Sequence, residues 1–222
     1  MARKSNKRKG KGNKVYALIV DGETEVWYFN MMYRNEKQIL PKVNIQPKLP
    51  KKRRLKEQYE EVVNYLELNV YETVIWLLDF DTIIKEDKER KKGQESSIQA
   101  LKKYKEKLEK YNSDEKSPKV KVLVNTPCLE FWYLLHFEKT SRYYSQCLPA
   151  IQDLKKHLHG YEKKQDYYVK QGNDIYLRLK PYLVQALANA GKLGDLDFYN
   201  PQSAKAEIYK IFSILGIDKR PV

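Results

Sequence analysis

The sequence predicts an α/β fold: a mostly parallel sheet of about four strands flanked by helices, with a helical C-terminal extension. Short apolar runs alternate with amphipathic stretches as far as residue 137, and parallel strands need such crossover helices between them. From about residue 140 the pattern becomes helical, and we predict no strand there. We expect a disordered basic arm over residues 1–14, a domain over 15–140 and a helical region over 141–222 packed on that domain.

Four apolar runs are predicted to be the strands. The run at 73–78 is apolar throughout, as expected for a central strand covered by helices on both faces. The first run is rich in β-branched residues and is followed closely by Gly22, which favours a turn. The predicted strands are residues 15–20, 43–46, 73–78 and 120–124.

Helices are predicted between the strands and throughout the C-terminal region. Pro127 suits the start of a helix, where its missing N–H is not needed, and Pro181 is expected to kink or split another helix. Residues 85–95 are strongly charged and contain Gly93, so we expect an exposed excursion there. The predicted helices are residues 25–34, 55–67, 98–111, 129–137, 151–159, 175–190 and 204–215.

The chain is strongly basic, with 43 Lys and Arg against 29 Asp and Glu and a net charge of +14. This excess favours a polyanionic partner, DNA or RNA first, although basic surfaces also serve membranes or solubility. Cys128 and Cys147 are too few for a disulfide scaffold and lack metal-ligand spacing, and Cys128 is interpreted as a small packed side chain. With no apolar run near about 18 residues and no signal-peptide core, we expect no membrane contact and a cytoplasmic location.

Basic segments are the candidate nucleic-acid contacts. They lie in the N-terminal arm, in a proline-punctuated loop and on the helix face at 102–110. The arm has the alternative role of a solubilising tail. Tyrosines interleave with basic residues at 161–170, which suits either stacking on unpaired bases or ordinary core and surface packing. The candidate phosphate-binding residues are Lys7, Arg8 and Lys9 in the arm and Lys51, Lys52, Arg53 and Arg54 in the loop.

Acidic residues follow three of the predicted strands. Asp21 and Glu25 follow the first, Asp79 and Asp81 follow the run at 73–78, and Glu130 follows the last in the first turn of a helix. Because the carboxyl ends of parallel strands meet at one edge of a sheet, we expect these side chains to lie together. An extended segment would point both aspartates of the Asp-x-Asp pair the same way.

Clustered carboxylates need a cation among them, because several like charges are costly to bury. Mg²⁺ prefers oxygen ligands and keeps several waters, so two or three carboxylates suffice. We predict Mg²⁺ or Mn²⁺ bound by Glu25, Asp79, Asp81 and Asp21, with Asp21, Glu25 and Glu130 as the catalytic groups. The alternative for each site is an acidic residue that caps a helix or complements its dipole.

The motifs at these positions resemble those of the RloB family. The quoted segments are Asp21-Gly-Glu-Thr-Glu25 with Trp27-Tyr28-Phe29, Asp79-Phe-Asp81, Asn125-Thr-Pro-Cys-Leu-Glu-Phe-Trp-Tyr-Leu-Leu-His-Phe137 and Asn200-Pro-Gln-Ser203. The family pattern resembles E-G-x-T-E-x-x-Y-F, D-x-D, N-P-x-F-E-x-W-x-L-L-H and a closing N-P-x-T/S. The resemblance spans roughly residues 15–215, and its third motif is the most distinctive.

The resemblance implies a fold of the TOPRIM type, which topoisomerases, bacterial primases and OLD-family nucleases share. It implies that Asp79 and Asp81 match the metal-binding D-x-D and that Glu25 matches the second carboxylate of OLD-type nucleases. Asp21 stands where TOPRIM enzymes carry a glutamate that ligates metal or transfers a proton, and its side chain is one methylene shorter. A second departure is the family's proline, displaced here to Pro127.

Two main hypotheses follow for the function. The first is a Mg²⁺- or Mn²⁺-dependent nuclease acting on DNA or RNA, which the resemblance places in phage defence or abortive infection beside restriction–modification genes. The second is a catalytically weak or inactive nucleic-acid or nucleotide-binding module that acts with a partner ATPase or restriction–modification component. A non-enzymatic interaction protein is the third alternative. His136 is a candidate for either a structural or a catalytic role.

Overall fold

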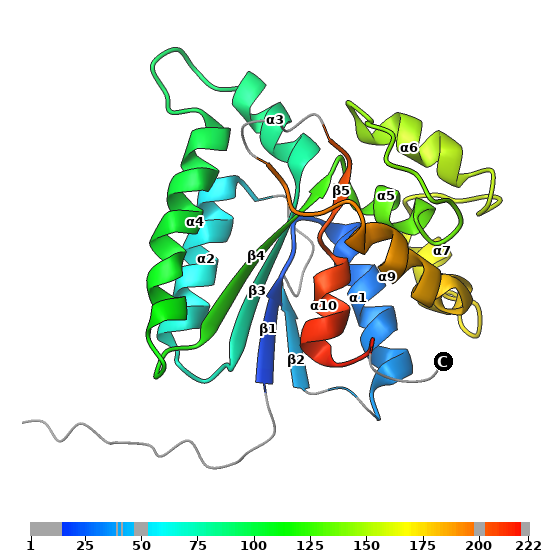
Figure 1. The fold of residues 1–222 in the computed structure, drawn as a ribbon, viewed down its shortest axis with the longest axis horizontal. Coiled ribbons are helices and arrows are strands. Elements are labelled where there is room, and N and C mark those ends of the chain that lie inside the picture. Colours follow the sequence, from blue (N-terminus) through cyan, green and yellow to red (C-terminus); the bar gives the residue numbers. More distant parts are fainter. Residues whose placement is uncertain (1–14, 39, 41, 47–52, 198–202, 219–222) are drawn as a thin grey trace, which may run out of the picture.

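A computed structural model describes residues 15–38, 40, 42–46, 53–197 and 203–218. Its centre is a five-stranded sheet in the order β2-β1-β3-β4-β5 (Figure 1). The strands are β1 (Val15–Ile19), β2 (Lys42–Gln46), β3 (Thr73–Asp79), β4 (Lys119–Thr126) and β5 (Lys205–Ala206). Strands β1 to β4 pair in parallel, which confirms the predicted mostly parallel α/β sheet.

Strand β5 is the one element of the sheet that we did not predict. It pairs antiparallel with β4, so that Asn125 faces Ala206 and Thr126 faces Lys205. A two-residue strand is too short to give the alternating pattern on which strand prediction depends. The prediction of no strand after residue 140 is therefore wrong at this point.

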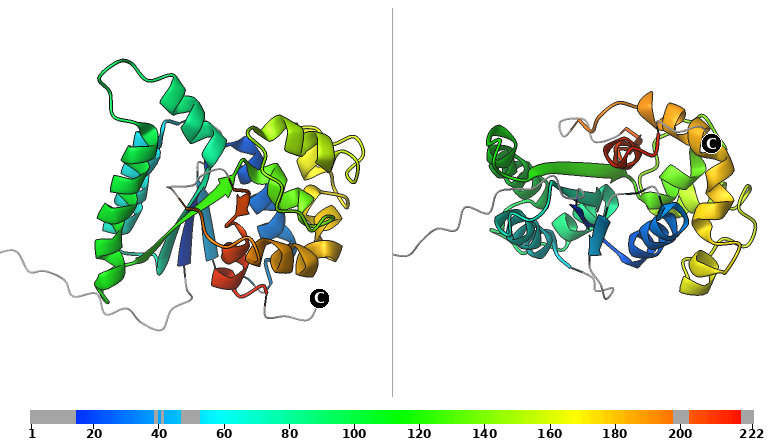
Figure 2. Two further views of the ribbon diagram at one scale, coloured as in Figure 1. Left: turned by 45° about the horizontal axis from the view of Figure 1, so that its top comes forward. Right: turned by 90° about the horizontal axis from the view of Figure 1, so that it is seen from below.

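Helices cover both faces of the sheet (Figures 1 and 2). Helices α2 (Leu55–Glu67), α3 (Phe80–Lys88) and α4 (Ser97–Ser113) pack on one face, where Ala17, Ile19 and Trp76 point. Helix α1 (Glu23–Glu36) and the C-terminal helices pack on the other face, where Leu18 and Ile75 point. Alternate residues of β1, β3 and β4 therefore enter different cores, as expected for strands buried on both sides.

The C-terminal region consists of short helices. The predicted helix over residues 175–190 is divided at Pro181, as expected. Ile175–Leu179 and Leu183–Gly191 are α-helices, and a 3-10 turn over Lys180–Tyr182 separates them. The helices that follow β4 are α5 (Leu129–Leu134), α6 (Cys147–Leu154), α7 (Gln165–Val169), α8 (Ile175–Leu179), α9 (Leu183–Gly191) and α10 (Tyr209–Leu215).

Several predicted boundaries are wrong. Helix α3 runs to Lys88, so the exposed excursion starts only after it, and Gly93 turns there with a φ of +87°. Helix α5 ends at Leu134 rather than at residue 137, and Pro127 precedes its N-cap instead of starting it. Helix α6 lies four residues earlier than predicted, and α10 begins only at Tyr209 because β5 and a turn precede it.

The C-terminal region shares a core with the α/β part of the chain. Tyr161, Tyr176 and Phe212 are buried in one apolar cluster with Tyr28 and Trp132. The division at residue 140 and the arm over residues 1–14, which lies outside the described residues, stay predictions. Within the part of the chain that the structure describes, no helix has both the length and the apolar character that crossing a membrane requires.

Candidate functional site

Asp79 lies at the centre of the carboxyl edge of the sheet. It is the last residue of β3, and the strand register places it beside Asn125 of β4. Its Oδ2 accepts a hydrogen bond of 3.1 Å from the backbone N–H of Leu129, at the start of α5. Burial raises the pKa of Asp79 well above its usual value, and the charges of four neighbouring carboxylates raise it further. Those carboxylates are Glu25, Asp81, Asp21 and Glu130.

Asp81 does not share an extended segment with Asp79, so that prediction is wrong. Strand β3 ends at Asp79, and α3 begins at Phe80, which places Asp81 in the first turn of a helix. Burial raises the pKa of Asp81 to about 6, against the lowering effect of Lys163. The two aspartates still interact, because the charge of Asp81 contributes to the raised pKa of Asp79.

Glu25 faces the same cluster from the first turn of α1, and its side chain is buried. Burial raises its pKa to about 7, and the charges of Asp21 and Glu130 add to the rise. The carboxylate lies against the backbone of Gly22, where a Cβ added to the glycine would be only 3.0 Å from Glu25 Oε2. A residue larger than glycine would therefore have to push Glu25 away. Glu23 of the same turn is exposed, as expected.

Asp21 is held at the rim of the cluster by two other elements. Its Oδ1 accepts from Gln58 Nε2 of α2 at 2.7 Å, and its Oδ2 accepts from Thr82 Oγ1 of α3 at 2.6 Å. Burial raises the pKa of Asp21 despite these two hydrogen bonds. A cavity of about 680 Å³ opens beside Asp21, and Arg53, Arg54 and Lys85 contribute to its lining along with several glutamates.

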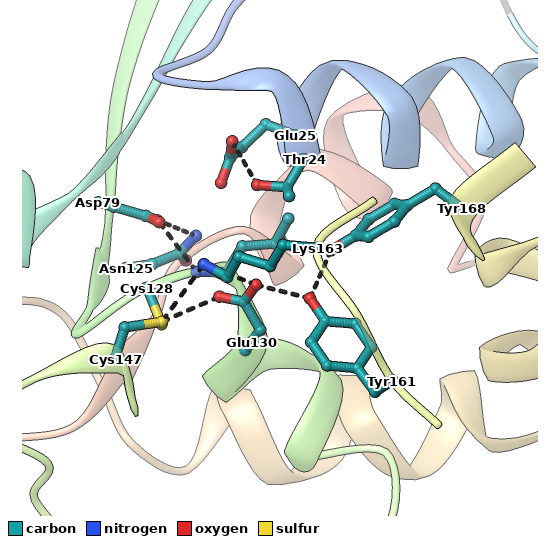
Figure 3. Close-up of a disulfide and its surroundings, with 11 residues drawn as sticks. Thr24, Glu25, Asp79, Asn125, Cys128, Glu130, Cys147, Tyr161, Lys163 and Tyr168 are labelled. Atoms are coloured by element: carbon teal, nitrogen blue, oxygen red, sulfur yellow. Dashed lines mark hydrogen bonds and ion pairs between the residues drawn. A yellow bond between two sulfur atoms is a disulfide. The ribbon is translucent and has the colours of Figure 1, made fainter. Parts of the chain in front are cut away.

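Glu130 completes the cluster from the first turn of α5, and it is fully buried. Its Oε1 accepts a hydrogen bond of 2.6 Å from Tyr161 and lies 2.8 Å from Lys163 Nζ. Figure 3 shows the Lys163 side chain reaching from its loop towards Glu130 and Asp79. The charges of Glu130, Asp79 and Glu25 outweigh the effect of burial and raise the pKa of Lys163.

Sequence reasoning missed Tyr161 and Lys163, which belong to the segment interpreted as a candidate base-stacking surface. Tyr161 and Tyr168 are buried, and their hydroxyl groups lie 2.5 Å apart in the core. They are therefore not available for stacking on nucleic acid. The one signal that pointed to this segment was its alternation of tyrosine and lysine, and it carried no information about Glu130.

Cys128 and Cys147 form a disulfide, which corrects the interpretation of Cys128 as a packed free side chain. Cys128 caps α5, and Cys147 is the first residue of α6. The Cys147 sulfur lies 3.0 Å from Glu130 Oε2 (Figure 3). Nineteen residues separate the two cysteines along the chain, so their spacing gave no indication that they meet in space.

The donor chemistry of the cluster fits a divalent cation. The charges of neighbouring carboxylates help to raise the pKa values of Glu25, Asp79 and Asp81, and Lys163 pairs with Glu130 of the same cluster. Excess negative charge of this kind favours a hard cation with oxygen ligands. In the described part of the chain, however, the only group of three acidic, histidine or cysteine ligand atoms within 4.8 Å of one another is Cys128, Glu130 and Cys147. The carboxylates would therefore have to draw together around a metal.

His136 lies in the core rather than in the cluster. Its side chain is fully buried, and its Nδ1 lies 3.0 Å from the backbone oxygen of Trp132. Burial lowers the pKa of His136 to about 3. The ring is therefore neutral at ordinary pH, and its surroundings are those of a structural histidine.

The candidate phosphate-binding residues are only partly described. Arg53 pairs with Glu61 and is largely covered, and its exposed neighbour Arg54 precedes α2. Both contribute to the lining of the cavity beside Asp21. Lys7, Arg8, Lys9, Lys51 and Lys52 lie outside the described residues. On α4, Lys103, Lys107 and Lys110 are exposed along the predicted basic face.

A model of the RloB-like protein family matches residues 16–213, which is most of the chain. The chain belongs to the RloB-like protein family. The match spans β1 to α10, so every element of this RloB-like fold that contributes to the carboxylate cluster lies within it. The mixed α/β architecture is roughly consistent with the TOPRIM-type fold that the motifs implied. No curated protein and no solved structure matches the chain.

Proposed function

We propose that this RloB-like protein is a divalent-metal-dependent nuclease that hydrolyses phosphodiester bonds of DNA or RNA. The observation that supports the proposal best is the buried acidic cluster at the carboxyl edge of the sheet. Asp79, Glu25 and Asp81 come from three separate elements, and burial together with the charges of neighbouring carboxylates raises the pKa values of all three. A fold maintains such a costly arrangement when a cation binds there.

Each carboxylate has a distinct part in this proposal. Asp79 is fixed by the N–H of Leu129 and would hold Mg²⁺ or Mn²⁺ together with Glu25 and Asp81. A metal bound there supplies Lewis acidity and lowers the pKa of a coordinated water. Glu25, with a pKa of about 7 in the metal-free protein, can accept or release a proton near neutral pH. Asp21 adds negative charge at the rim, where Gln58 and Thr82 orient it.

Lys163 and Tyr161 act on the site through Glu130. The hydroxyl of Tyr161 and the ammonium of Lys163 both meet Glu130 Oε1, which fixes the position of that carboxylate. The Lys163 side chain is 43% exposed, so part of it reaches solvent beside the cluster. A phosphate group that approaches from solvent would meet this positive charge first.

The substrate would approach along the cavity beside Asp21. Arg53, Arg54 and Lys85 lie in its lining beside Asp21 and four glutamates, so the attraction of a polyanion rests mainly on the net charge of +14, which acts at long range. On this proposal the protein acts in phage defence or abortive infection beside restriction–modification, with an ATPase or a restriction–modification component as its partner.

A cleavage assay tests the proposal. Single- and double-stranded DNA and RNA are incubated with the protein in Mg²⁺ or Mn²⁺, with and without a chelator. We expect metal-dependent cleavage that Asp79→Asn abolishes. Asp114→Asn, which removes an exposed carboxylate on the loop before β4, is the matched control and should leave cleavage intact. Cleavage that survives Asp79→Asn would contradict the assignment of the activity to the acidic cluster, and no cleavage of any substrate would contradict a nuclease.

The geometry of Asp21 favours one alternative. Both of its oxygens are engaged by protein donors, and its side chain is shorter than the glutamate of the family pattern. A nucleic-acid or nucleotide-binding module without hydrolysis, acting beside a partner protein, would tolerate this arrangement. Salt-sensitive binding of oligonucleotides that is unchanged in Asp79→Asn would favour the binding module over the nuclease.

A further inference from the structure

The disulfide lies directly beside the carboxylate cluster and connects two segments that build it. We propose that Cys128–Cys147 is a redox-active disulfide, opened by an external dithiol at Cys147, which holds Lys163 on the carboxylates of the candidate site. Cys128 is attached to the helix that carries Glu130. Cys147 begins the helix that leads, through the loop at 155–164, to Lys163.

The two sulfurs differ in accessibility. Cys128 is 1% exposed, whereas Cys147 is only partly buried and lies among exposed neighbours, including Gln146 and Leu148. Cys147 is therefore the cysteine that an external thiolate can approach more easily. Disulfides with an exposed sulfur are the more labile ones, because exchange requires in-line access of the attacking thiolate. This asymmetry favours attack at Cys147, with Cys128 as the leaving group.

Contacts of the Cys147 sulfur link its redox state to the site. The sulfur lies 3.0 Å from Glu130 Oε2 and 3.7 Å from Lys163 Nζ, while Lys163 pairs with the other oxygen of Glu130 (Figure 3). A disulfide sulfur carries no hydrogen and gives the carboxylate no hydrogen bond. Reduction adds a hydrogen that the Cys147 thiol can donate to Glu130. The reduced thiol therefore gives Glu130 a second donor at Oε2, which lowers the dependence of this carboxylate on Lys163.

The path of the chain explains why Lys163 would move while the fold stays intact. The segment from Cys147 to Lys163 is held by the disulfide at its first residue and by buried side chains along its length, namely Leu154, Leu158 and Tyr161. Those apolar contacts do not depend on the disulfide. Lys163 itself is long and 43% exposed, so it is the part of the loop that can leave the cluster most readily.

The exchange balances with a dithiol as the reductant. One thiolate of the dithiol attacks Cys147 Sγ, the sulfur–sulfur bond breaks, and Cys128 leaves as a thiolate that takes up a proton. The second thiol of the reductant, as its thiolate, then attacks the reductant sulfur that is bonded to Cys147. This attack releases Cys147 as a thiolate, which is protonated in turn. Two electrons and two protons pass to the protein, and the dithiol becomes a disulfide.

Metal binding should then depend on the redox state, a consequence that rests on the proposed function. Lys163 pairs with Glu130, and its charge also attracts Asp79 and Glu25, two of the proposed metal ligands. The oxidised protein therefore holds an internal positive charge beside the place where a metal would bind. We expect the reduced protein to bind Mn²⁺ at least about fivefold more tightly, which is the lower end of ordinary coupling between sites. The opening of the disulfide itself does not depend on the metal.

Two measurements on the full-length folded protein test the inference. Hydrogen exchange followed by mass spectrometry is compared between oxidised and dithiol-reduced protein, and Mn²⁺ is titrated into both forms. Reduction without denaturant, faster exchange at 155–164 and tighter Mn²⁺ binding are expected. Cys147→Ser should behave as the reduced form under all conditions. Lys163→Met should bind Mn²⁺ equally well in both forms.

Two results would overturn the inference: a disulfide that stays closed until the protein unfolds, or identical exchange at 155–164 in the two forms. If exchange at 155–164 changes while neither form binds Mn²⁺, the redox inference holds and the proposed metal site fails. If both forms bind Mn²⁺ equally and exchange is unchanged, the metal site holds and the redox inference fails. The two proposals are thus separable.

Discussion

Lys163 Nζ lies 2.8 Å from Glu130 Oε1, so a cation from the C-terminal region neutralises a carboxylate at the end of the parallel sheet. The same oxygen accepts a hydrogen bond from the Tyr161 hydroxyl, so Glu130 is one of the residues through which the C-terminal region contacts the α/β part of the chain. The ammonium also lowers the pKa values of Glu25 and Asp81. The charge balance of the whole cluster therefore depends on a residue outside the recognisable motifs.

Removing the Lys163 charge should raise the pKa values of the remaining carboxylates. In Lys163→Met, the carboxylates lose their attraction to the ammonium, so we expect the pKa of Asp81 to rise above its value of about 6. Carbon-13 NMR titration of the side-chain carboxyl groups measures this directly in the metal-free protein. Lys155→Met, which removes an exposed lysine at the end of α6, is the control. Unchanged carboxyl pKa values in Lys163→Met would show that Lys163 does not neutralise the cluster.

Replacing Glu25 by its neutral isostere should stabilise the metal-free protein at neutral and higher pH. The pKa of Glu25 rises from 4.5 to about 7 on folding, so the native state holds its proton more tightly than the unfolded chain does. Below pH 4.5 Glu25 is protonated in both states, and its ionisation costs no folding free energy. The cost grows as the pH rises to about 7. The full cost is at most about 3.5 kcal/mol, at about 1.4 kcal/mol per pKa unit.

Urea denaturation of wild type and Glu25→Gln at pH 4.5 and pH 8 measures this difference. We expect the free energy of unfolding of Glu25→Gln to increase relative to that of the wild type as the pH rises from the lower value to the higher one. Mg²⁺ should restore the stability of the wild type and leave that of the variant nearly unchanged, because a bound ligand stabilises only the form that binds it. A stability difference that does not vary with pH would contradict a raised pKa for Glu25.

Loss of the Tyr161 hydroxyl should weaken the fold around Glu130. This hydroxyl donates to Glu130 and lies within hydrogen-bonding distance of the Tyr168 hydroxyl, and all three side chains are buried. Tyr161→Phe should cost about 1–3 kcal/mol of unfolding free energy, since it leaves a buried charged acceptor short of a donor. Thermal unfolding of Tyr161→Phe against Tyr143→Phe, which alters a more exposed tyrosine, provides the comparison. Equal melting temperatures would indicate that water replaces the lost hydroxyl.

The sequence predicted the sheet well because its signals are local. Buried runs such as Thr73–Asp79 and the amphipathic pattern of Leu55–Glu67 show their structure within a few residues. The placement of Asp79 beside Asn125 then follows from parallel pairing alone. By contrast, β5 has two residues and depends on its partner β4 for its conformation.

The parts of the site that escaped prediction are the long-range ones. Tyr161 reaches Glu130 from 31 residues away, and nothing in the local pattern around either residue indicates the other. Cys128 and Cys147 meet because α5 and α6 pack together, which spacing rules for cysteine do not anticipate. His136 belongs to a recognisable motif, yet its burial makes it a structural residue. Motifs identified the carboxylates, and tertiary packing determined what surrounds them.

A calorimetric titration with Mn²⁺ tests the central claim, that these carboxylates form a divalent-metal site. The protein is kept reduced with a phosphine, and wild type, Asp79→Asn and the control Asp114→Asn are compared at about pH 7.5, above the raised pKa of Glu25. We predict that wild type and the control bind Mn²⁺ with the same affinity. The affinity of Asp79→Asn should be at least about tenfold lower, because one fixed oxygen ligand loses its charge. Equal Mn²⁺ affinity in wild type and Asp79→Asn, or no binding by wild type, would contradict the claim that these carboxylates form a divalent-metal site.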